Sequence, residues 1–187
     1  MKAMNKGKII VISGPSGCGK GTVISRLLKM DASFKLSVSM TTRAPREGEA
    51  DGREYYFVSK QEFKRRILSG DLLEYTCYNG NYYGTPLKEI SHFQEQGITI
   101  LLDIEIEGAA NVRKAKPDNL ITIFLAPPSF EVLRERLIGR GTESMDVIEK
   151  RLERAKTELE EQDKYDYIVV NDCLDEAVKQ IYEIIKQ

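Results

Sequence analysis

The residues from Lys8 to Thr22 read KIIVISGPSGCGKGT, and this stretch constrains the fold more than any other part of the chain. The run from Ile9 to Ile12 is continuous and β-branched, which is typical of a strand buried on both faces. Three glycines follow within six residues, and the apolar spacing after Lys20 predicts an amphipathic helix. Glycines let backbone N–H groups approach an anion closely, and a helix N-terminus adds partial positive charge. The stretch therefore predicts a phosphate-binding loop.

This loop has the G-x-x-x-x-G-K core of a P-loop, in which the lysine supplies a mobile charge for the outer phosphates of a nucleoside triphosphate. A tight strand-to-helix turn is the alternative, but the lysine and both flanking elements together favour phosphate binding. Gly21 stands where the strict motif has Ser or Thr, so a Mg²⁺ ion has three possible holders: Thr22, water or the nucleotide itself. The residues expected to contact the triphosphate are Gly14, Pro15, Ser16, Gly17, Cys18, Gly19, Lys20, Gly21 and Thr22.

With 187 residues, 41% of them hydrophobic, the chain suits one α/β domain with room for inserted subdomains. The net charge is −1, and the basic run from Lys64 to Arg66 is expected on a solvated helix face, so no nucleic-acid partner is expected. The apolar run that ends at Ser13 is too short for a signal peptide, and no stretch approaches a membrane span. We therefore expect no membrane partner.

Cys18, Cys77 and Cys173 are scattered without C-x-x-C spacing, which favours a reducing, cytoplasmic location. Cys18 lies in the glycine-rich loop and is expected to react with thiol reagents. His92 is the only histidine, which excludes Ser-His-Asp catalysis and a His-rich metal site, and we expect it on a helix surface. A monomer or a small homo-oligomer is expected.

Predicted strands alternate with predicted helices along most of the chain. Buried-type strands are expected at 9–12, 34–38, 98–102, 120–125 and 167–170. Later helices are expected at 86–96, 108–116, 129–138, 145–159 and the C-terminus. This alternation predicts an α/β fold with a doubly wound, mainly parallel five-stranded sheet, whose ligands gather at the carboxyl ends of the strands.

One region departs from this alternation. Residues 40–52 are polar and rich in Arg, Pro and Gly, which predicts a functional loop. A strand at 55–58, a helix at 60–68, a strand at 72–75 and a turn at Asn79-Gly80 then predict an inserted α+β subdomain. We expect a core of residues 1–38, 86–133 and 152–187, an insert of residues 39–85, and a small lid of residues 134–151.

Several charged residues stand where a phosphate ligand would need them. Arginine matches phosphate oxygens bidentately, and the candidates are Arg43, Arg46, Arg140 on its glycine-flanked loop, and Arg151. Taken singly, each could equally be a solvated surface charge. Asp103 ends a buried strand, where a carboxylate lies near magnesium in many P-loop proteins; the alternative is a helix N-cap.

Six blocks, together with the P-loop, closely resemble guanylate kinases and occur in that family's order. They are SVSMTTRAPR at 37–46, GREYYFV at 52–58, GNYYGT at 80–85, LDIE at 102–105, GRGT at 139–142 and VND at 170–172. Ordered blocks are far more specific than any single motif, and they extend over essentially the whole chain. The resemblance implies a P-loop kinase that uses ATP and Mg²⁺ to phosphorylate GMP, and also dGMP, to the diphosphate by in-line transfer.

The resemblance also implies a role for individual residues. The guanine edge would be read by Ser39, Glu74 and Thr85, and the GMP phosphate would be held by Arg43, Arg46, Tyr55 and Tyr83. Asp103 would lie near the base or near the metal-bound phosphates, and both placements stay open. The transferred phosphoryl group would be served by Lys20, Arg43, Arg140 and Arg151, and Asn171 would lie near the adenine. Thr85 replaces a serine of some members and keeps the hydroxyl.

Elementary chemistry agrees with this implication. An ionised Glu74 only accepts hydrogen bonds, and guanine offers N1–H and the 2-amino group, whereas adenine offers neither. A phosphate monoester has a second pKa of about 6, so the acceptor is already mostly dianionic at neutral pH and needs no general base.

Three other functions would leave different marks on the sequence. A P-loop GTPase would carry N-K-x-D and D-x-x-G motifs, and the sequence has neither. A non-catalytic, guanylate-kinase-like interaction domain would have lost the P-loop chemistry. An AMP kinase shares the GKGT ending of the loop but not the acceptor region.

Overall fold

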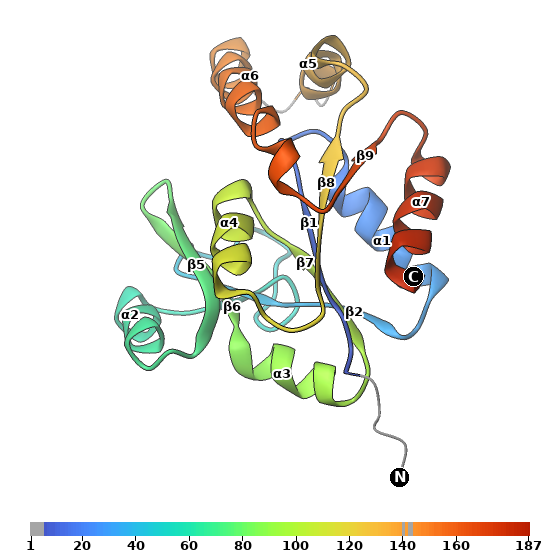
Figure 1. Cartoon of the computed structure of the whole chain (residues 1–187). Coiled ribbons are helices and arrows are strands. Elements are labelled where there is room, and N and C mark those ends of the chain that lie inside the picture. Colours follow the sequence, from blue (N-terminus) through green and yellow to red (C-terminus); the bar gives the residue numbers. More distant parts are fainter. Residues whose placement is uncertain (1–5, 140, 142–143) are drawn as a thin grey trace.

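The computed structural model describes residues 6–139, 141 and 144–187, and within them the chain forms a five-stranded and a four-stranded sheet (Figure 1). The five-stranded sheet has the order β2-β7-β1-β8-β9, and all its neighbouring strands are parallel. Its strands are β1 (Ile9–Ser13), β2 (Phe34–Leu36), β7 (Thr99–Asp103), β8 (Leu120–Ala126) and β9 (Tyr167–Val170). The predicted doubly wound, mainly parallel five-stranded sheet is therefore confirmed.

The central strand β1 is buried on both faces because helices cover both sides of this sheet. Ile10 and Ile12 join the core against α1 (Lys20–Met30) and α7 (Leu174–Lys186). Ile9 and Val11 point the other way, as strand geometry requires, and join the core against α3 (Leu87–Glu95) and α4 (Ile106–Ala115). Helix α4 begins two residues before the predicted start at Gly108, since Glu105 is its N-cap.

The four-stranded sheet is formed by the chain between β2 and α3. Its order is β4-β3-β6-β5, and β6 is antiparallel to both its neighbours. The elements of this part are β3 (Ser39–Thr41), β4 (Tyr55–Phe57), α2 (Lys60–Leu68), β5 (Leu72–Tyr78) and β6 (Asn81–Pro86). Helix α2 packs beside the sheet through Phe63, whose ring stacks on Tyr82 with 5.3 Å between centroids.

Some predictions for this region are wrong. Met40 and Thr41 belong to β3 rather than to a loop, because they pair with Gly84 and Tyr83 of β6. The segment predicted as a strand at 34–38 forms β2 only as far as Leu36. The predicted strand at 72–75 continues to Tyr78, and β6 occupies residues for which the pattern predicts no strand. The turn at Asn79-Gly80 is confirmed, and both its residues have the positive φ that a tight hairpin needs.

Helices α5 (Phe130–Gly139) and α6 (Met145–Leu159) pack together beyond one end of the five-stranded sheet (Figure 1). They bury a hydrophobic cluster of their own, formed by Leu133, Leu137, Ile148, Leu152 and Ala155. A short 3₁₀ turn, η1 (Gln162–Lys164), leads from α6 towards β9. Of the glycine-flanked loop between α5 and α6, Arg140 and Thr142 lie outside the described residues. In the described part of the chain, no helix has the length and apolar character needed to cross a membrane.

Candidate active site

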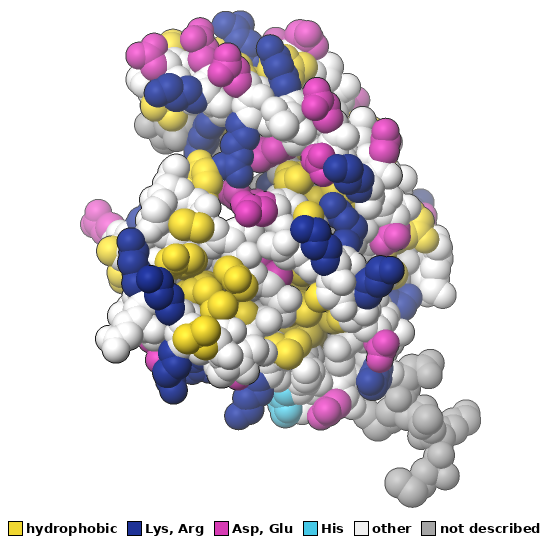
Figure 2. All heavy atoms as spheres, turned by 60° about the vertical axis from the view of Figure 1, so that its left-hand side comes forward, with side chains coloured by type: hydrophobic (Ala, Val, Ile, Leu, Met, Phe, Trp, Pro, Cys, Tyr) yellow, Lys and Arg dark blue, Asp and Glu magenta, His cyan; other side chains and the backbone are white. Residues whose placement is uncertain are grey.

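A cleft of about 370 Å³ separates the carboxyl ends of β1 and β7 from the four-stranded sheet and from α6. Figure 2 shows basic and acidic side chains crowded around the hollow beneath the α5–α6 part. The structure brings into its lining the predicted residues Gly14, Ser16, Lys20, Ser39, Arg43, Arg46, Tyr55, Glu74, Tyr83, Asp103 and Arg151. The predicted residues that do not line it are Pro15, Gly17, Cys18, Gly19, Gly21, Thr22, Thr85 and Asn171. Arg140 lies outside the described residues.

The P-loop joins β1 to α1 in a backbone path that glycine favours. Gly14, Gly17 and Gly19 have φ values of 148°, 93° and 97°. At Gly14 a Cβ would also collide with the carbonyl oxygen of Leu125, so both conformation and space exclude a side chain. Lys20 opens α1 and donates from Nζ to the Gly14 carbonyl oxygen at 2.7 Å, which places its charge at the concave side of the loop.

The back of the loop is held by Asn171. Its Nδ2 donates to the Cys18 carbonyl oxygen at 2.7 Å, and it lies so close to Gly19 that a Cβ there would be 2.5 Å from it. Asn171 is buried, so its amide supports the loop from behind. The structure disfavours the expected reaction of Cys18 with thiol reagents: the thiol is fully buried, and burial raises its pKa, which disfavours the reactive thiolate.

One end of the cleft contains a buried carboxylate on β5. The Thr85 hydroxyl on the adjacent strand β6 donates to Glu74 Oε1 at 2.7 Å. The second oxygen, Oε2, lies where a Cβ on Gly108 would be 2.9 Å away, so glycine at that point of α4 keeps the space open. The pKa of Glu74 is raised to about 7, chiefly by burial and to a smaller degree by Glu107, while the Thr85 hydrogen bond acts to lower it. A ligand that offers hydrogen-bond donors would favour the ionised form.

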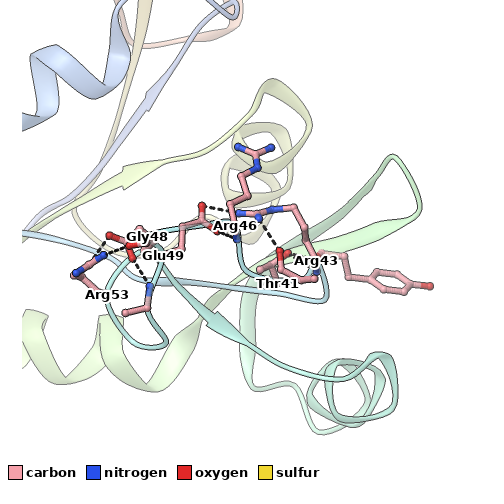
Figure 3. A network of polar contacts seen from close by, with 10 residues as sticks. Thr41, Arg43, Arg46, Gly48, Glu49 and Arg53 are labelled. Atoms are coloured by element: carbon pink, nitrogen blue, oxygen red, sulfur yellow. Dashed lines mark hydrogen bonds and ion pairs between the residues drawn. The ribbon is translucent and has the colours of Figure 1, made fainter. Parts of the chain in front are cut away.

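Where residues 39–85 line the cleft, the Glu49 carboxylate binds both Arg43 and Arg46 (Figure 3). Arg43 Nη2 donates to Glu49 Oε1 at 2.9 Å, and Arg46 donates its backbone N–H to Glu49 Oε2 at 2.7 Å. The Arg43 guanidinium also lies 5.4 Å from the centre of the Tyr55 ring and 5.8 Å from that of Phe57. The Arg46 guanidinium extends away from the Glu49 carboxylate (Figure 3).

Asp103 lies on the floor of the cleft, near the P-loop. It pairs with Ile12 in the parallel register of β7 and β1, just before Gly14. The Asp103 side chain is exposed to the cleft, but the protein around it reduces the solvation of its carboxyl. This loss of solvation raises the pKa of Asp103, while Lys20 lowers it. The alternative in which Asp103 caps the next helix is wrong, because the N-cap of α4 is Glu105.

Sequence reasoning gave no role to several residues of the cleft lining: Glu49, Thr76, Tyr78, Ile104, Gly108, Arg154 and Glu158. Thr76 and Tyr78 follow Glu74 with the spacing of one strand face, so the alternation along β5 was an available signal. Glu49 and Arg154 act through ion pairs that depend on tertiary structure, and no local pattern marks them.

A parallel sheet with a P-loop at its switch point, and a cleft lined by one lysine and several arginines, define a nucleotide-binding protein of the P-loop kinase class. The guanylate kinase family profile matches residues 6–187. Guanylate kinase of Listeria innocua serovar 6a is 52% identical over 182 residues, which are 97% of this chain and 88% of the relative. Guanylate kinase of Lactococcus lactis subsp. lactis is 48% identical over 181 residues, with the same coverages. The crystal structure of guanylate kinase from Anaplasma phagocytophilum superposes with a TM-score of 0.79 at 34% identity, covering 97% of this chain and 86% of that one. The chain belongs to the guanylate kinase family.

Proposed function

We propose that this protein transfers the terminal phosphoryl group of ATP to GMP and forms GDP. The observation that carries the proposal is the placement of Glu74, a buried carboxylate, in the same cleft as the P-loop lysine, Lys20. An ionised carboxylate only accepts hydrogen bonds, so it selects a base with paired donors. Guanine has such donors at N1 and the 2-amino group. Because the sugar takes no part in this argument, we extend the proposal to dGMP.

We assign the acceptor to the insert and the donor to the P-loop. Glu74 and Ser39 read the base, with Thr85 holding the Glu74 carboxylate from behind. Arg43, Arg46, Tyr55 and Tyr83 hold the GMP phosphate, and Lys20, Arg43, Arg140 and Arg151 serve the transferred group. Asp103 lines the cleft near the P-loop, and we assign it to the acceptor nucleotide or to the metal-bound phosphates. We keep the division into a core, an insert of residues 39–85 and a lid of residues 134–151.

The chemistry asks mainly for positioning and charge neutralisation. The GMP phosphate is mostly dianionic at neutral pH, since its second pKa is about 6, and it attacks without a general base. The obstacle is repulsion between two charged phosphate groups, which Lys20 and the arginines of the cleft reduce electrostatically. We assign Asn171 an indirect role, in which it braces the P-loop through the Cys18 carbonyl oxygen, rather than the expected place near the adenine.

We propose that Mg²⁺ is bound mainly through the ATP phosphates and water. Thr22 is exposed and does not line the cleft, and the described residues contain no group of three or more metal-ligating side chains. Mg²⁺ commonly keeps several waters and takes only one or two carboxylates from the protein, and Asp103 is a carboxylate of the cleft lining whose pKa Lys20 lowers. The ion would supply further charge neutralisation. The free cysteines of the described chain fit a cytoplasmic location, which we also propose.

A coupled assay of ATP consumption, with GMP, AMP, UMP and CMP offered separately, tests the function. We expect rapid turnover with GMP and at least about 10⁴-fold lower kcat/KM with AMP, because a site built for donors leaves its carboxylate unpaired with adenine. Equal use of AMP would contradict the base assignment. No turnover with any monophosphate, from protein that binds GMP, would favour the non-catalytic interaction domain.

Replacing Glu49 by glutamine should weaken GMP binding much more than it slows the chemical step. Arg43 and the Arg46 backbone N–H bond to different oxygens of Glu49, and glutamine has only one acceptor oxygen. The variant therefore loses one of the two bonds, and the loop that carries both arginines loses its fixed geometry. We expect the KM for GMP to rise about 10-fold, as for loss of one charge-assisted hydrogen bond, with kcat within about 2-fold of the parent. Glu47→Gln, an exposed neighbour with the same charge change, is the control. An unchanged or lower KM would show that Glu49 does not organise the arginines.

A further inference from the structure

Arg154 on α6 joins three parts of the cleft wall that are far apart in the chain. Its Nε donates to Glu158 Oε1 at 2.8 Å, and its Nη2 forms an ion pair with Glu105, in the connection between β7 and α4. Its guanidinium carbon lies 4.4 Å from the centre of the Tyr78 ring, at the end of β5. We call these four residues the Arg154 bridge, and all of them line the cleft.

The two ends of the bridge carry different halves of the site. Side chains alternate along a strand, so Glu74, Thr76 and Tyr78 share one face of β5, and all three line the cleft. Tyr78 thus belongs to the wall that holds the base-reading carboxylate. At the other end, Arg151 lies one helical turn before Arg154 on α6, and both line the cleft.

The packing of α6 shows which contacts connect this helix to the four-stranded sheet. The apolar side of α6 packs on α5 in a hydrophobic cluster that includes no residue of the four-stranded sheet. Leu159 at the end of α6 packs against the main core, and polar contacts from the Arg154 side hold the preceding turns of α6 relative to β5. A guanidinium can pair with carboxylates along its edge and stack on an aromatic ring with its face at the same time, which an ammonium cannot do.

We propose that Arg154 is a positioning residue, which fixes α6, and with it Arg151, at the distance from β5 that phosphoryl transfer requires. The proposal rests on the proposed function, since it concerns alignment of the ATP and GMP halves. Each nucleotide still binds its own half without the bridge, but the reacting atoms are then less well aligned. Misplacement by about 1 Å can cost up to about 100-fold in rate.

The test compares Arg154→Met, which keeps the apolar stem, with Arg154→Lys, which keeps the charge. We expect kcat to fall about 10-fold in Arg154→Met, with the KM for GMP and for ATP within about 3-fold of the parent. Arg154→Lys should recover only a minor part of kcat, because it restores charge but not the stacked fork. Arg65→Met removes an exposed arginine from an ion pair on α2, and serves as the matched control. Wild-type kcat in folded Arg154→Met would overturn the proposal.

A second pair of variants leaves every charge in place. Tyr78→Leu removes the ring and should lower kcat as Arg154→Met does, whereas Tyr78→Phe keeps the ring and should retain most of it. The double variant Arg154→Met/Tyr78→Leu should be no slower than Arg154→Met alone; multiplied losses would overturn the bridge. If Arg154→Met fails to fold by circular dichroism, the Tyr78 pair carries the test. An inactive parent would contradict the proposed function, whereas an active parent with indifferent bridge variants contradicts the bridge alone.

Discussion

Lys20→Ala should lose about 10³-fold in kcat while keeping its fold, because the only full positive charge on the P-loop is then gone. Lys20 donates to the Gly14 carbonyl oxygen in this structure and is poised to exchange that bond for phosphate oxygens. The loop glycines and the helix N-terminus remain in the variant, so ATP binding should weaken much less than turnover. Steady-state kinetics with GMP, and calorimetric titration with ATP, separate the two effects.

The controls for this variant are straightforward. The Lys20 hydrogen bond is worth about 1 kcal/mol, so the melting temperature should fall by only a few degrees. Lys29→Ala changes an exposed lysine in the last turn of the same helix and should behave as the parent does. Full turnover by folded Lys20→Ala would exclude this loop as the catalytic site.

The second large effect is expected at Glu74. Glu74→Gln presents an amide NH₂ or a neutral oxygen to guanine instead of a carboxylate, and Thr85 continues to donate to one side of the group. We expect kcat/KM for GMP to fall by at least about 10²-fold, with the KM for ATP little changed, since the site then leaves buried donors or acceptors unpaired. Glu95→Gln on α3 is the control for an exposed carboxylate. Unaltered use of GMP would disprove base recognition by Glu74.

The raised pKa of Glu74 gives this variant a pH signature. GMP binding favours the ionised carboxylate, so the affinity of the parent for GMP should rise with pH through about 7. In Glu74→Gln only the ionisation of the GMP phosphate, near pH 6, should remain. Isothermal titration between pH 5.5 and 8.5, on the order of one experiment per half unit, distinguishes the two profiles.

The stability of the parent protein should fall as pH rises, whereas its affinity for GMP should increase. Between the ordinary pKa of 4.5 and the folded value of about 7, folded protein holds a proton that unfolded chain has lost, so the parent loses stability as pH rises through this window. The glutamine variant has no such loss and should become the more stable protein above pH ~7, by up to roughly 3 kcal/mol. Thermal melts at both ends of the window check this, and a variant less stable than the parent at high pH would contradict it.

The parts of the fold that sequence predicted well carry their own local signal. β1 is a continuous buried run, and α2 and β9 occupy the residues that the pattern predicts. The insert was harder because its short strands are stabilised by partners distant in the chain. Met40 and Thr41 become a strand through pairing with Gly84 and Tyr83, and nothing in their own sequence indicates it.

The same distinction holds within the cleft. The P-loop is a contiguous motif, and its glycines and lysine could be named from residue types and spacing alone. The roles of Glu74 and the arginines came from the family resemblance, since a strand carboxylate has no local signature. Arg154 was missed because it acts through an ion pair with Glu105, 49 residues away in the chain, and Glu49 because its ion pair with Arg43 depends on how their loop folds.

Gly108 sits inside the first turn of α4, where glycine is less favourable than alanine by about 1 kcal/mol. A methyl group there would lie 2.9 Å from Glu74 Oε2, in the space that we propose for the purine. In the proposed function, the low helix propensity of Gly108 is therefore the cost of leaving room for the guanine base beside Glu74. Screens that select variants of this enzyme for heat resistance alone should favour alanine at position 108. The proteins they yield should be more thermostable but should bind GMP poorly.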